Sequence, residues 1–144
     1  MDKPAPQAFV YRISTADEWA QLQRTGGTLG GDLDRSTGCI HLSDLSQVRK
    51  TLKNFFLGRN DLYLLQVDTS KLSDGLVYEA ADDSNYFPHF YGPGRSFAPL
   101  QLDAVIKEAE KIVLVEYLNG TGCVLNFALA AAHVTPPSEQ QNCT

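Results

Sequence analysis

The sequence predicts an α+β protein, in which two small antiparallel sheets form a split β core with two helices in the N-terminal half. Two observations lead to this class. Apolar residues recur at helical spacing in two early segments, one capped by Thr15 and the other by Ser43 or Asp44. Later in the chain, short apolar runs separated by turn residues are typical of strands. We assign residues 8–130 to one globular domain and residues 1–7 and 134–144 to flexible tails.

The first strand and helix follow from alternation and capping. Residues 9–13 alternate as a strand, with Arg12 on the face opposite its aromatic and branched neighbours. Thr15 and Glu18 form a capping box, because each side chain can satisfy the other residue's free backbone amide. The helix that they open ends at Gly26-Gly27.

A polar loop is expected over residues 30–37, followed by a short strand at residues 38–43. Ile40 and Leu42 fall on one face of this strand, whereas the other face carries a thiol, an imidazole and a hydroxyl, from Cys39, His41 and Ser43. Because a face of that kind is a poor core surface, we expect it to border a cleft or a polar network. The second helix follows and ends at Gly58.

The rest of the chain is predicted to be mostly strands. The run at residues 62–68 is almost continuously apolar, as expected of a central strand that is covered on both faces. A turn at residues 119–122 predicts a hairpin between its flanking strands. The remaining expected strands are residues 76–79, 104–106, 112–117 and 123–127.

Residues 85–93 combine four aromatic side chains with His89 and end in Gly92-Pro93. Pro88 and the final Gly92-Pro93 argue against a regular element, so we predict an apolar loop pressed against the body of the protein. Two interpretations remain open. The loop is either a hydrophobic plug with a structural histidine or the wall of a functional cleft.

Composition excludes several classes of function. The net charge of −5 argues against a nucleic-acid partner, because phosphate backbones are bound by basic surfaces. The chain shows neither an apolar run of membrane-spanning length nor a signal peptide, so we predict no membrane association. The three cysteines lack metal-ligand spacing and indicate reduced thiols in the cytoplasm.

The candidate site residues come from separate segments. We predict that Arg12, His41 and His89 converge on one anionic ligand. One rival is a thiol–imidazole nucleophile made by Cys39 and His41. Another is a metal site made by both histidines and Glu79, but these residues lack the close spacing that such sites usually show, and we expect no metal.

Four blocks of the chain resemble the family known as Domain of Unknown Function 952. The family pattern contains a tyrosine-histidine strand, Gly-Phe-Ile-His-x-Ser and Phe-Pro-His-Leu-Tyr-Gly-Pro. The matching blocks, which keep the family's order between about Phe9 and Tyr117, are residues 10–13, 38–43, 64–68 and 87–93. The chain differs at Arg12 and Thr37, where family members carry histidine and glutamate.

That family looks related to the ADP-ribosyltransferase-like folds, and this likeness implies a cleft that holds NAD or a related nucleotide as substrate. The implied catalytic residues are His89 as base, Glu79 as carboxylate and His41. The implied cofactor-binding residues are Arg12, His41, Ser43, Tyr86, Tyr91 and Gly92. Two alternatives stay open: a non-catalytic module that binds a nucleotide or phosphorylated metabolite, and a protein-interaction domain that uses the aromatic loop.

Overall fold

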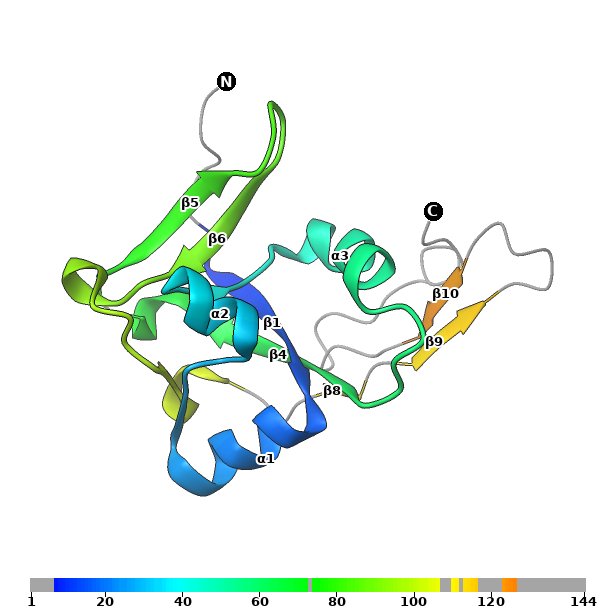
Figure 1. Ribbon diagram of the computed structural model, residues 1–144, viewed down its shortest axis with the longest axis horizontal. Coiled ribbons are helices and arrows are strands. Elements are labelled where there is room, and N and C mark those ends of the chain that lie inside the picture. Colours follow the sequence, from blue (N-terminus) through cyan, green and yellow to red (C-terminus); the bar gives the residue numbers. More distant parts are fainter. Residues whose placement is uncertain (1–6, 73, 107–109, 112, 117–122, 127–144) are drawn as a thin grey trace.

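The computed structural model describes residues 7–72, 74–106, 110–111, 113–116 and 123–126. Its helices and strands follow one another as Figure 1 shows. The α-helices are α1 (Ala16–Thr25), α2 (Asp32–Thr37) and α3 (Val48–Phe55). The strands are β1 (Phe9–Thr15), β2 (Gly27–Thr28), β3 (Ile40–His41), β4 (Leu62–Asp68), β5 (Leu76–Ala80), β6 (Tyr86–Phe90), β7 (Leu100–Gln101), β8 (Glu110–Lys111), β9 (Val113–Glu116) and β10 (Cys123–Asn126).

Strand pairing confirms the α+β class and its antiparallel sheets. One three-stranded sheet has the order β1-β4-β8 and the other has the order β3-β6-β5, while β2-β7 and β9-β10 form two-stranded pairs. The backbones of Tyr11 and Ser43 exchange hydrogen bonds of 2.7 and 2.8 Å, and this bridge joins the two larger sheets. The split β core is therefore continuous at that point, and β3 and β1 lie next to each other.

The core occupies both faces of β1. Tyr11 and Ile13 pack under α3 with Leu52 and Leu64, whereas Val10 packs on the opposite side. The second side is completed by buried apolar residues from β3, β4, β6 and the following segments: Ile40, Leu42, Val67, Leu72, Phe90, Leu100 and Ala104. With both faces of the strand covered, Arg12 is only 7% exposed, and its charge has to be satisfied inside the protein.

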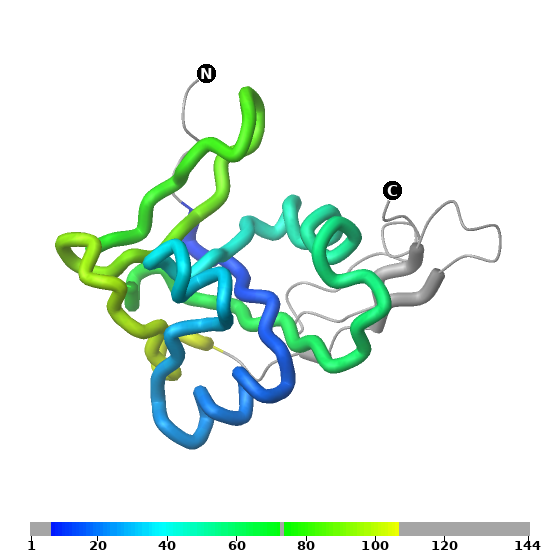
Figure 2. The backbone as a smooth tube through the Cα atoms, viewed as in Figure 1, coloured from blue at the N-terminus to red at the C-terminus, as the bar shows by residue number. Residues whose placement is uncertain are grey.

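The aromatic segment was predicted to be a loop, and this prediction is wrong. Residues 86–90 form β6, the central strand between β3 and β5. Pro88 lies opposite Tyr78 of β5 and, on its other side, accepts a 3.0 Å hydrogen bond from the Leu42 amide. The backbone N–H that a proline lacks would point past the end of β3, which stops at His41. The ladder between β3 and β6 therefore loses no hydrogen bond at this position, and the sheet tolerates the proline. The β5–β6 hairpin extends away from the rest of the fold, as the green part of the tube in Figure 2 shows.

Two other predicted segments differ from the structure. The polar loop at residues 30–37 contains α2, which lies in front of β1 and β4 in Figure 1. Residues 102–104 form a single 3-10 turn, and only Val105 of the expected strand makes an isolated bridge, to Val67. Polar composition concealed α2, because this short helix packs through Asp34 and through no apolar residue.

Other predicted elements are present, but two are shorter than expected: the strand expected at residues 38–43 is β3 alone, and the second helix, expected to end at Gly58, ends at Phe55. The strand at residues 62–68 is β4, the central strand of its sheet, and β9 pairs with β10 as the hairpin pattern requires. The second helix starts with a 3-10 turn at Leu45–Gln47, where the Asp44 carboxylate accepts a 3.0 Å bond from the Gln47 amide. The hairpin turn at residues 119–122, residues 1–6 of the first expected tail and the second expected tail at residues 134–144 lie outside the described residues. Across the part of the chain that is described, no helix is long and apolar enough to span a membrane.

Candidate functional site

A cavity of about 600 Å³ opens between the helices and the second sheet. Its walls come from β1, α1, α2, β3, α3 and the β5–β6 hairpin. Phe55, Phe56 and Phe87 supply aromatic surface, and Arg12, Asp34, His41 and His89 supply the polar inner wall. A concave, largely apolar space with a few convergent polar groups is the usual form of a small-molecule site.

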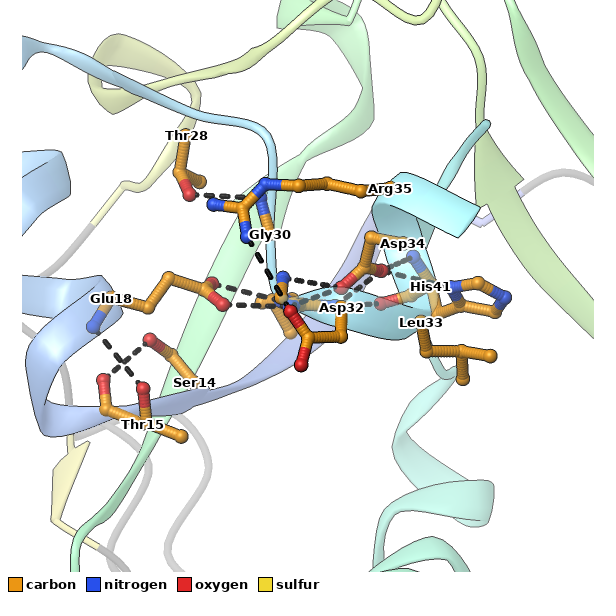
Figure 3. Close-up of polar contacts among 12 residues, drawn as sticks. Ser14, Thr15, Glu18, Thr28, Gly30, Asp32, Leu33, Asp34, Arg35 and His41 are labelled. Carbon is orange, nitrogen blue, oxygen red and sulfur yellow. Dashed lines mark hydrogen bonds and ion pairs between the residues drawn. The ribbon is translucent and has the colours of Figure 1, made fainter. Parts of the chain in front are cut away.

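Arg12 is the centre of the polar wall, and all of its donors are used. Its Nε and Nη2 donate to the two carboxylate oxygens of Glu18, at 3.0 and 2.7 Å. Its Nη1 and Nη2 donate to Asp34 at 3.0 and 2.9 Å, and Nη1 also donates to the His41 carbonyl at 3.0 Å. A guanidinium has five N–H groups, so Arg12 keeps none for a ligand. Figure 3 shows the carboxylates of Glu18 and Asp34 pointing toward each other.

Asp34 connects this charge to the first histidine. Its Oδ1 accepts from both the backbone amide and the Nδ1 of His41, each at 2.8 Å, and its Oδ2 accepts from the Gly31 amide at 2.8 Å. Burial by itself raises the pKa of the Asp34 carboxyl, but the hydrogen bonds from His41 and the charge of Arg12 outweigh it and hold that pKa well below its usual range. Asp34 is therefore ionised at neutral pH.

The His41 ring is oriented by this carboxylate. In the neutral imidazole, the proton on Nδ1 points to Asp34, and Nε2 is then the unprotonated nitrogen. That Nε2 lies 3.5 Å from the Thr37 hydroxyl and 3.9 Å from the Cys39 sulfur, both of which are weak contacts at most. His41 can thus accept a proton on Nε2 while its other nitrogen stays fixed.

Glu79 orients the second histidine in the same way. Its Oε1 accepts from His89 Nδ1 at 2.7 Å and from the Tyr91 hydroxyl at 2.6 Å. Arg95 lies 3.6 Å from the other carboxylate oxygen and stacks 4.1 Å above the Tyr91 ring. Burial raises the pKa of Glu79, but the bonds from Tyr91 and His89 outweigh it and lower that pKa, while the same carboxylate raises the pKa of the Tyr91 phenol.

The two histidines meet across the ladder between β3 and β6. His41 and His89 are direct cross-strand partners, so their side chains lie on the same face of the sheet. Their ring centroids are 4.8 Å apart and the ring planes cross at 65°. Both imidazoles are thus neighbours in the cavity wall, and each is held through Nδ1 by its own carboxylate.

The structure brings together four of the predicted site residues: Arg12, His41, Ser43 and His89 all line the cavity. Glu79, Tyr86, Tyr91 and Gly92 are not part of that lining. Glu79 and Tyr91 reach it only through His89, and the Tyr86 carbonyl accepts a 2.7 Å bond from Gln47. Gly92 has a packing role, because its backbone lies directly against Gly75.

Sequence reasoning missed Asp34 and the second function of Glu18. The signal for Asp34 was its place three residues after Gly31, where a carboxylate can accept the free amide at the start of a helix. Glu18 was assigned to a capping box, and the Thr15 hydroxyl does accept its amide at 3.1 Å. The glutamate side chain, however, binds Arg12 and does not reach back to the cap.

The rival chemistries are less well placed. Cys39 is 2% exposed and lies outside the cavity lining, which leaves its thiol without access to a substrate. Among the described residues, no group of three or more histidine, cysteine, aspartate or glutamate side chains is placed to hold a metal ion.

The fold and the cleft together define a small α+β protein with paired, carboxylate-held histidines, and comparison with known proteins places it in a family. Residues 13–108 match the family described as protein of unknown function (DUF952), and the chain belongs to that family. No curated protein matches the chain significantly.

Solved structures of one bacterial protein share the fold. The crystal structure of CC0527 from Caulobacter crescentus is 29% identical, with a TM-score of 0.63 over 78% of this chain and 90% of that one. A double mutant of the same protein gives 28% identity and a TM-score of 0.63 over the same shares. Its solution NMR structure gives 28% identity and a TM-score of 0.62, covering 79% and 90%. These comparisons leave the likeness to ADP-ribosyltransferases as a prediction.

Proposed function

We propose that the cleft binds NAD or a related nucleotide and that the His41–His89 pair supplies proton transfer for cleavage of its N-glycosyl bond, as in ADP-ribosyl transfer. One observation carries the proposal: two carboxylate-held imidazoles lie 4.8 Å apart in the wall of a cavity of about 600 Å³. A histidine whose Nδ1 is fixed by a carboxylate is a usual arrangement for a general base. The resemblance described above supplies the substrate class.

The chemistry assigned to the pair conserves atoms and charge. The bond between ribose C1′ and the nicotinamide nitrogen breaks, and its electron pair leaves with nicotinamide. An acceptor hydroxyl or water forms the new bond to C1′ and gives its proton to Nε2 of His89. Positive charge that develops on the ribose is stabilised by the ionised Asp34 carboxylate of the cavity lining. This carboxylate needs no reorganisation, because its hydrogen bonds already hold it in place.

Within this proposal, Glu79 and Arg12 act through their neighbours. Glu79 lies outside the cavity lining and bonds His89 Nδ1, so we assign it as a positioning residue for that imidazole. Arg12 holds Asp34, which in turn holds His41. This assignment differs from direct contact of Arg12 with a ribose or phosphate, because its five donors are already engaged.

Nicotinamide release from NAD tests the proposal. The full chain should release nicotinamide, measured by chromatography, and His89→Ala should lower that rate by about 10²–10⁴-fold, the usual contribution of a general base. Glu79→Gln should lower the rate less and shift its pH profile, because the imidazole remains but loses its charged partner. Leu57→Ala is the matched control, since this exposed side chain lies outside the cavity.

The second candidate is a nucleotide-binding module without turnover. It is favoured because Arg12 and Glu79 are both bonded to other protein groups, so neither charge is free to act on a ligand in the cavity. NAD would then raise the thermal midpoint of the chain without producing nicotinamide. A protein-interaction surface on the aromatic segment has less support, because Phe90 is 5% exposed in the core and Phe87 lines the cavity.

A further inference from the structure

The lining of the cleft carries more negative than positive charge. Among the described residues, four carboxylates, from Asp17, Glu18, Asp32 and Asp34, share the lining with two guanidiniums, from Arg12 and Arg35. Arg12 is buried, and its donors all end on protein acceptors. Arg35 is exposed and lies 3.8 Å from Asp32. Glu18 and Asp34 together carry one more charge than the Arg12 that they share, and the charge of Arg35 is matched by Asp32, so an anionic group in the cleft would meet net negative charge.

Large apolar side chains stand open at the same cleft. Phe55 of α3 is 76% exposed and Leu33 of α2 is 61% exposed, and both line the cavity from different helices. Keeping a phenyl ring in water costs the burial energy that it would gain in the core. Open aromatic surface beside a cavity is instead suited to a planar ligand ring that covers it. An aromatic face also attracts a cation through its quadrupole.

We infer that the cleft selects a planar aromatic cation, which stacks on Phe55 and turns its positive charge toward the carboxylates of the inner wall. Charge complementarity and the exposed ring lead to the same occupant. The inference rests on the proposed function in that it concerns the same cleft. It adds that the ring's positive charge decides affinity and that phosphate groups stay outside the inner wall.

Three pyridine derivatives of similar size test the inference on the full chain: 1-methylnicotinamide, which is a cation, nicotinamide, which is neutral, and nicotinate, which is an anion. Dissociation constants come from chemical-shift titrations at low salt. We expect 1-methylnicotinamide to bind tightest, about 3- to 30-fold tighter than nicotinamide, and nicotinate to bind weakest. Added salt should reduce the difference between the cation and the anion.

Phe55→Ala should weaken binding of the cation by about tenfold, whereas Phe55→Tyr should retain it. Leu57→Ala is the control, because this residue lies two positions after Phe55 and is 47% exposed but does not line the cavity. Equal or tighter binding of nicotinate overturns the inference, and so does failure of all three rings to bind. Release of nicotinamide from NAD is measured separately, so loss of charge selectivity and loss of the proposed activity are distinguishable.

Discussion

Replacing Asp34 by alanine is expected to lower the free energy of unfolding by about 3–5 kcal/mol, because it leaves the buried Arg12 guanidinium with half of its ionic partners. Asp34 is 4% exposed, and its oxygens accept from Arg12, from the His41 ring and backbone and from Gly31. The substitution thus leaves several interior donors without acceptors. Urea unfolding of the two proteins, followed by circular dichroism, measures the loss.

Asp32→Ala is the matched control for this substitution. It removes the same side chain two residues away, but that side chain is fully exposed and only 3.8 Å from another exposed group, Arg35. We expect the unfolding midpoint of this variant to equal that of the wild type. A loss below about 1 kcal/mol in Asp34→Ala would mean that Arg12 is satisfied without Asp34 and would contradict the arrangement described here.

The same pair of proteins has an expected pH dependence. The folded-state pKa of Asp34 is lowered, so its contribution to stability is fully present above the unfolded carboxyl pKa of about 4 and is lost as the pH falls toward the folded value. The difference in unfolding free energy between wild type and Asp34→Ala should therefore stay constant from neutral pH to about pH 5. Below about pH 4 the difference should shrink.

Replacing Gly75 by alanine is expected to cost about 3–5 kcal/mol of stability, the sum of backbone strain and a core clash. Gly75 has a φ of 108°, which side-chain-bearing residues rarely adopt. An added Cβ would also overlap the backbone of Gly92, at the base of the β5–β6 hairpin that carries His89. Neither segment can move freely, because the Tyr91 amide donates to the Gly75 carbonyl at 2.8 Å.

Gly58→Ala separates strain from the clash. Gly58 also has a positive φ, of 84°, but nothing lies within 4 Å of its added Cβ. We expect this variant to lose only about 1–2 kcal/mol, the cost of the left-handed backbone alone. Equal losses in the two variants would show that Gly75 and Gly92 are not held together as tightly as described.

Local patterns predicted the helices and strands whose signal is carried by neighbouring residues. The run at residues 62–68 and the caps at Thr15 and Asp44 depend on short-range alternation and hydrogen bonding, and the structure contains all three. Pro88 led to the wrong prediction of a loop, because whether a sheet tolerates a proline depends on where the neighbouring strand ends. The end of β3 is set by long-range pairing, which no local pattern around Pro88 contains.

The sequence predicted the two histidines of the candidate site, but it did not predict which charged groups pair with each other there. His41 was placed on a non-core face by simple alternation, and His89 by its unusual segment; their pairing follows from the β3–β6 register. Arg12 was expected to bind a ligand because it lies on the face opposite the aromatic and branched residues of its strand. The bonds to Glu18 and Asp34 depend on how α1 and α2 pack beside β1, so only the folded chain reveals that its donors are used.

Imidazole NMR of the full chain during a titration with NAD tests the paired-histidine cleft most directly. The ring signals are assigned by their loss in His41→Ala and in His89→Ala. Both rings should shift along a single saturation curve, because they share one wall of the cavity. Ring signals that stay unchanged at saturating NAD, or that follow two unrelated curves, would contradict a shared nucleotide site.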